Sequence, residues 1–82
     1  MSFPLDELLS FLGELRAAKI HYRLGQIRDE TILVEVTVPG ERWEVEFFGD
    51  GEVEVEVFRS GGDIWGREKL AELMSKFGEP HA

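Results

Sequence analysis

The spacing of hydrophobic residues changes twice along this chain, and the change constrains the fold more than any other feature. From Leu5 to Lys19 hydrophobic residues recur with the period of an α-helix. From Ile20 to Phe58 they alternate with polar residues, as in half-buried strands, and after Asp63 the helical spacing returns. The order of helix, strands and helix predicts an α+β domain.

Each predicted helix is amphipathic, so each has one face to bury. The N-terminal helix is expected to bury its leucines, which are Leu5, Leu8, Leu9, Leu12 and Leu15. The C-terminal helix is expected to bury Leu70, Leu73, Met74 and Phe77 and to expose Glu68, Lys69, Glu72 and Lys76. Both apolar faces must pack against another apolar surface, and the sheet is the only large one that the sequence predicts.

Four alternating segments lie between the helices, and short connections at residues 29–30, 39–40 and 49–51 separate them. Connections this short join antiparallel neighbours, so the simplest topology is a meander. The prediction is an α-β-β-β-β-α fold in which a four-stranded antiparallel β-meander carries both helices on one face. With 82 residues the chain is expected to form a single domain, residues 1–82.

The chain carries 17 acidic against nine basic residues, a net charge of −8. Such a charge repels phosphate backbones and anionic lipid, so neither nucleic acid nor membrane is an expected partner. No apolar run is long enough to cross a bilayer, and no basic segment leads into an apolar one at the N-terminus, so a cytoplasmic location is expected. The absence of cysteine excludes disulfides and thiolate chemistry.

The alternation leaves glutamates on the sheet face opposite the helices. A three-residue turn at residues 49–51 would place Glu46 opposite Glu54 and Glu44 opposite Glu56, so that like charges face each other. A four-residue loop at residues 39–42 would place Val36 opposite Val45, and a bulge at residues 25–26 would absorb a change of parity in the first strand. The predicted rows are Arg23, Glu35, Glu46, Glu54 and His21, Thr37, Glu44, Glu56.

Three interpretations of this acidic face remain open. The glutamates could keep an exposed sheet soluble and discourage aggregation. They could bind a basic protein, since Leu33, Phe48 and Phe58 would also point outward and mix apolar with charged side chains. They could bind a divalent cation, with His21, Glu44 and Glu56, or Glu35, Glu46 and Glu54, as ligands, although no fixed-spacing metal motif is present.

The leading hypothesis is a non-enzymatic protein-interaction module, such as an inhibitor, immunity protein or adaptor, and the alternative is a cation-binding protein. The residues predicted to bind the partner are Glu35, Glu44, Glu46, Glu54, Glu56, Phe48 and Phe58. Self-association is a further arrangement that the pattern allows, because no proline protects the edge strands.

No catalytic residue or cofactor is predicted. Ser60 lacks the sequence context of an activated serine, and a lone strand histidine such as His21 is not by itself a catalyst. Trp43 alternates with Val45 and Phe47 and is expected in the core. Trp65 either covers the end of the sheet beside the second helix or stands partly exposed as an anchor for another chain.

One segment resembles a known group of sequences. PGERWEVEFF, from Pro39 to Phe48, with the Val-Glu alternation that follows it up to Phe58, is similar to a segment of small uncharacterised bacterial proteins. The resemblance implies a cytoplasmic bacterial protein, and it supplies no catalytic or binding residue.

Overall fold

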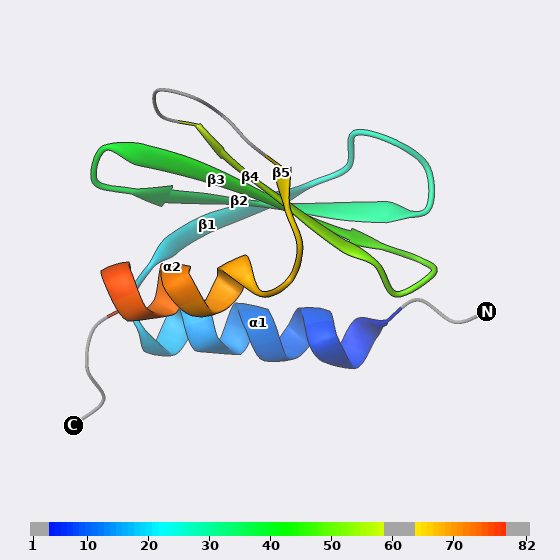
Figure 1. The fold of residues 1–82 in the computed structure, drawn as a ribbon. Helices are drawn as coiled ribbons and strands as arrows, with labels where there is room; N and C mark the ends of the chain where they lie inside the picture. The colour runs from blue at the N-terminus through cyan, green and yellow to red at the C-terminus, as the bar shows by residue number, and fades with distance from the viewer. Residues whose placement is uncertain (1–3, 59–63, 79–82) are drawn as a thin grey trace.

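The computed structural model describes residues 4–58 and 64–78. It has the predicted α+β architecture, an antiparallel sheet with two helices on one face (Figure 1). The elements are α1 (Leu5–Ala17), β1 (His21–Gly25), β2 (Thr31–Val38), β3 (Glu41–Phe48), β4 (Val53–Phe58), β5 (Ile64–Trp65) and α2 (Lys69–Phe77). The sheet order β1-β2-β3-β4-β5 confirms the four-stranded meander and adds the two-residue strand β5 at its edge.

One face of the sheet supplies most of the core. Val34, Val36, Val45 and Val55 are fully buried there, and Trp43 and Phe47 lie among them. Because side chains alternate along a strand, burying these residues forces the charged side chains of the same strands onto the opposite face, called the outer face below.

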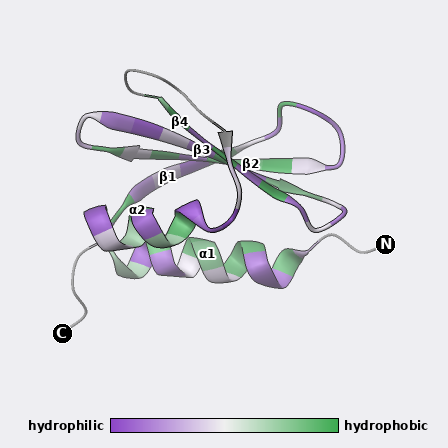
Figure 2. Cartoon of the chain, in the orientation of Figure 1, coloured by the Kyte–Doolittle hydropathy of each residue, from purple (hydrophilic) through white to green (hydrophobic). Residues whose placement is uncertain are grey.

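The buried stripe of α1 differs from the predicted one. Leu8, Phe11 and Leu15 are buried, and the ring of Phe11 lies 5.8 Å from that of Phe47. Leu5 and Leu9, predicted as core residues, are 52% and 55% exposed. The buried stripe is centred on Leu8, Phe11 and Leu15, so the Phe11 ring faces the sheet, and Leu5 and Leu9 lie outside the stripe on its far side. Figure 2 shows hydrophobic and hydrophilic residues alternating along α1.

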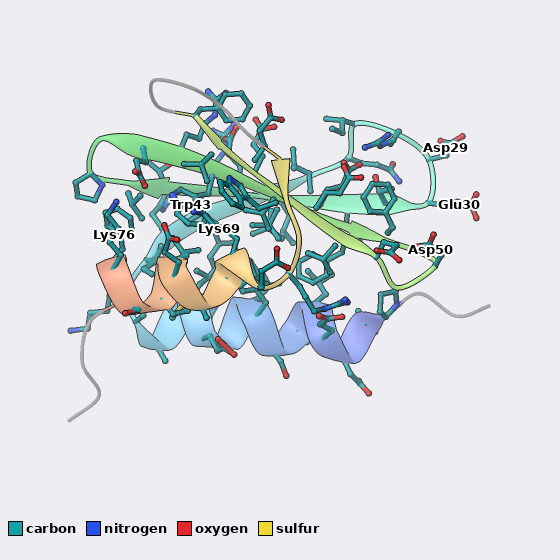
Figure 3. All side chains as sticks on the ribbon, in the orientation of Figure 1. Asp29, Glu30, Trp43, Asp50, Lys69 and Lys76 are labelled. Carbon is teal, nitrogen blue, oxygen red and sulfur yellow. The ribbon has the colours of Figure 1, made fainter. Side chains whose placement is uncertain are left out.

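Lys69 was predicted to face solvent but is buried. Its ammonium group lies 4.1 Å from the ring centre of Trp65 and 5.8 Å from that of Trp43, and its Nζ donates to Glu72 at 2.8 Å. Figure 3 shows Trp43 and Lys69 together between α2 and the sheet. The aliphatic part of the lysine side chain is buried like an apolar side chain, while the aromatic rings and a carboxylate stabilise the charge of its ammonium group.

The two tryptophans have different environments. Trp43 is in the core, as predicted, and its indole Nε1 donates to Glu41 at 2.8 Å. Trp65 is opposite Val55 in the β4–β5 pair, on the helix-covered side, and remains 38% exposed. It therefore lies at the end of the sheet beside Lys69 of α2 and is also partly exposed, so each of the two predicted descriptions holds in part.

Polar contacts connect the helices to the sheet. Arg67 donates through Nε and Nη2 to Glu7 of α1 at 2.9 and 3.0 Å, and Nη2 also donates to the carbonyl of Gly51 at 2.7 Å. The hydrogen bonds from Arg67 hold the pKa of Glu7 below its usual range. At the other end of α2, Lys76 donates to Glu41 of β3 at 3.4 Å. These contacts fix both helices against the same sheet face.

We predict that Phe11→Ala lowers the free energy of unfolding by about 3 to 5 kcal/mol, because it removes a buried aromatic ring and leaves a cavity. Leu9→Ala, two positions away on the same helix, should change it by no more than about 0.5 kcal/mol. Chemical denaturation of both variants measures the difference. Equal losses in the two variants would contradict the observed burial of α1.

Candidate functional site

The outer face carries all five glutamates predicted to bind a partner, but the row order differs from the prediction. β2 and β3 join through a two-residue turn at residues 39–40, where Gly40 adopts a φ of +79°, instead of the expected four-residue loop. Val36 is therefore opposite Trp43 and not Val45. A shift of two residues keeps every side chain on its face and changes only its cross-strand neighbour.

The corrected rows follow from the pairing of the four long strands. Glu35 is opposite Glu44 and Leu33 opposite Glu46, while the predicted pairs Glu44 with Glu56 and Glu46 with Glu54 are confirmed. Arg23 opposite Glu35 and His21 opposite Thr37 are also confirmed. The observed rows are Arg23, Glu35, Glu44, Glu56; Leu33, Glu46, Glu54; and His21, Thr37, Arg42, Phe58.

The β1–β2 loop places an arginine over this face, which the sequence analysis did not predict. β1 ends at Gly25, so no bulge forms at residues 25–26, and the loop rises on the side of the sheet opposite the helices (Figure 1). Arg28 donates through Nε and Nη2 to the two carboxylate oxygens of Glu46, each at 2.8 Å. It also lies 3.6 Å from Glu54. Two of the predicted partner-binding glutamates, Glu46 and Glu54, are thus already paired with an arginine of the same chain.

Glu46 is the most buried of these carboxylates, with 5% of the residue exposed. The hydrogen bonds from Arg28 hold the pKa of Glu46 below its usual range, against the opposing effect of burial. The paired planar groups form the bidentate geometry that is strongest between arginine and carboxylate. Glu46 is therefore a structural anchor for the loop as well as part of the acidic face.

Two further arginines partly neutralise the middle of the face. Arg42 lies 3.5 Å from Glu44 and 3.9 Å from Glu35, and Arg23 lies 3.8 Å from Glu35. Burial raises the pKa of Glu44, Arg42 opposes that rise, and the neighbouring carboxylates of Glu35, Glu56 and Glu46 add to it. Glu44 thus has a crowded anionic environment that one arginine does not balance.

Phe48 and Phe58 lie on the outer face as predicted, but guanidinium groups cover them. Arg28 lies 4.8 Å from the ring centre of Phe48, and Arg42 lies 4.5 Å from that of Phe58. Both residues are half-buried. The rings stabilise the two arginines through cation–π contacts and offer a partner less free apolar area than predicted.

A hollow of about 150 Å³ lies in the outer face beside the loop. Four of the predicted glutamates line it, Glu44, Glu46, Glu54 and Glu56, and so do Ile27, Arg28, Leu33 and Val55. Four carboxylates against one guanidinium leave an excess of negative charge. Glu56 carries much of this excess, because no ion pair to it is found among residues 4–58 and 64–78.

The carboxylate sets considered for a metal are not assembled. His21 lies in the row of Thr37 and Arg42, away from Glu44 and Glu56, and Glu35 is not in the row of Glu46 and Glu54. In the described part of the chain, no group of three or more histidine and acidic side chains could hold a metal ion. Asp29 and Glu30 point away from the fold (Figure 3). Ser60 lies outside the described residues.

Comparison with protein-family models, with curated proteins and with solved structures found no match for this chain. The bacterial origin implied by the PGERWEVEFF segment stays a prediction. Neither described helix is long and apolar enough to cross a membrane.

We predict that Glu46→Gln lowers the free energy of unfolding by about 1 to 3 kcal/mol at neutral pH, because it replaces charge-assisted hydrogen bonds with neutral ones. The folded-state pKa of Glu46 is lowered, so its contribution is complete above the ordinary pKa of glutamate, about 4.3, and is lost as the pH falls through the lowered value. Denaturation at neutral and acid pH should show the two proteins converging in acid.

Glu54→Gln is the matched control, because Glu54 shares the row and the arginine but is half exposed and lies 3.6 Å from Arg28. It should change the free energy of unfolding by no more than about 0.5 kcal/mol. If the two variants lose equal stability, Glu46 is not the anchor of the loop.

Proposed function

We propose that this protein is a non-enzymatic interaction module that binds a basic protein surface through its outer face, as an inhibitor, immunity protein or adaptor does. The observation that carries the proposal is the hollow lined by Glu44, Glu46, Glu54 and Glu56 with a single arginine. A cytoplasmic location is part of the proposal and follows from the composition of the chain.

The size of the hollow favours a protein side chain over a small molecule. Pockets for drug-sized ligands are about 300 to 1,000 Å³, and this hollow has about 150 Å³. One arginine or lysine side chain of a partner is a suitable occupant, with its charge among the carboxylates and its stem against Ile27 and Leu33.

The electrostatics of the hollow explain why a cation would be stabilised there. The pKa of Glu44 is raised by its burial and by three neighbouring carboxylates, so the ionised face is under repulsion. A bound guanidinium or ammonium group relieves that repulsion and should lower the pKa of Glu44. The internal arginines limit the site to the β3–β4 half of the face, where the carboxylates outnumber them.

We predict that Glu56→Lys weakens the binding of a fluorescein-labelled nona-arginine peptide at physiological ionic strength by tenfold or more, because it places a cation in the hollow. Glu56 has no ion pair in the described part of the chain, so the variant breaks none of the arginine pairs. Fluorescence anisotropy measures the dissociation constant.

Glu14→Lys is the matched control. It makes the same change in net charge at an exposed position of α1, on the side of the sheet that the helices cover. It should weaken the binding only slightly. If the two variants bind the peptide equally well, the attraction reflects net charge alone and the outer face is not the site.

A further inference from the structure

The edge strand β1 has an unpaired side. It is first in the sheet order and pairs only with β2 among the strands of residues 4–58 and 64–78. Four of its five residues are exposed, and it contains neither proline nor a bulge. A free edge of this kind presents backbone N–H and C=O groups that can pair with another extended segment.

The charge of this edge is opposite to that of the protein. Residues 15–28 contain Arg16, Lys19, Arg23 and Arg28 and no acidic residue, although the whole chain has a net charge of −8. Arg28 is paired with Glu46 on the outer face, so Arg16, Lys19 and Arg23 are the basic residues of the edge. The side chain of Arg23 is 76% exposed, and its contact with Glu35 is 3.8 Å long. In Figure 2 most of β1 is hydrophilic. The edge is therefore a basic strip on an acidic molecule.

An open hollow adjoins the first residues of β1. It has a volume of about 490 Å³ and is lined by Arg16, Lys19, Ile20, His21 and Tyr22. It lies where α1 gives way to the strand, so side chains from both elements form its walls. A carboxylate in this hollow would lie near the guanidinium of Arg16, and the imidazole of His21 would add a hydrogen-bond donor.

Exposed apolar side chains lie beneath the same edge. Leu24 of β1 is 56% exposed, although it has the parity of the helix-covered face. On α1, a hollow shared with α2 is lined by Glu7, Phe11 and Glu14, which marks the side that faces α2. Helical spacing puts the exposed Leu5 and Leu9 on the side of α1 away from α2.

From these observations we propose that β1 is a docking edge for an extended acidic segment of another protein, which adds to the sheet as a further strand. The segment alternates acidic and apolar residues. Its acidic side chains lie on the outer side beside Arg23 and His21, and its apolar side chains lie on the inner side beside Leu24. Backbone hydrogen bonds provide affinity, and the alternation provides specificity.

A second copy of this chain fits the edge less well. Antiparallel self-pairing that keeps the two faces aligned puts Arg23 opposite His21, Arg23 or Gly25 of the other copy, with no acidic residue of either β1 to balance it. A polyanion such as nucleic acid would form ion pairs with the basic side chains but would leave the backbone N–H and C=O groups of β1 unpaired. The row of free N–H and C=O groups therefore favours a peptide strand.

The test uses a fluorescein-labelled octapeptide that alternates glutamate and valine. We expect saturable binding by fluorescence anisotropy and slower hydrogen exchange of amides within residues 21–25 in the complex. Arg23→Gln should weaken the binding about fivefold. Lys76→Gln removes the same charge from the far end of α2 and should leave it within twofold.

A second peptide of the same composition, with four glutamates followed by four valines, separates strand addition from simple attraction of charge. It should bind at least fivefold more weakly than the alternating peptide. The proposal is overturned if the two peptides bind equally, if exchange slows outside residues 21–25 instead, or if the alternating peptide does not bind. Concentration-dependent protection of these amides in the free protein would assign the edge to a second copy.

Discussion

The burial of one sheet face under two helices is the constraint on which the rest of the molecule depends. Val34, Val36, Val45 and Val55 have no exposed surface, so their alternate neighbours must point to the other side. On β3 and β4 those neighbours are glutamates. The outer face is therefore acidic because of where the core lies, and its like-charged pairs persist because the core holds their strands in register.

The chain compensates for part of this repulsion with its own arginines. Arg28 reaches Glu46 and Glu54 from the β1–β2 loop, and Arg42 lies beside Glu44 on the sheet. Each guanidinium also covers an aromatic ring. What remains is a smaller acidic area around the hollow, and this area, not the whole face, is the surface that a basic partner would contact.

Hydrophobic spacing predicted the order of the two helices and the four long strands, the two layers and the side of the sheet on which each residue of those strands lies, because these depend on periodicity alone. It did not predict the two-residue strand β5. It predicted the β3–β4 register as well, since the three-residue turn was read correctly. The β2–β3 register was wrong by two residues because two-residue and four-residue loops preserve the same alternation.

The remaining errors involve tertiary contacts that the spacing of hydrophobic residues cannot predict. The position of Arg28 depends on a loop conformation, and no spacing rule links a loop arginine to a strand carboxylate. Lys69 is buried because two aromatic rings from other elements meet its charge. Phe11 replaces Leu9 in the core because ring size and helix placement decide between neighbouring apolar positions.

The molecule has two surfaces of opposite charge, an acidic hollow on β3 and β4 and a basic edge at β1. Amide chemical-shift mapping of the isotope-labelled protein, titrated separately with nona-arginine and with the alternating glutamate-valine peptide, tests this description most directly. We predict two separate sets of shifted amides, one on β3 and β4 around Glu44 and Glu56 and the other within residues 21–25. Overlapping sets, or small shifts spread over all charged residues, would contradict it.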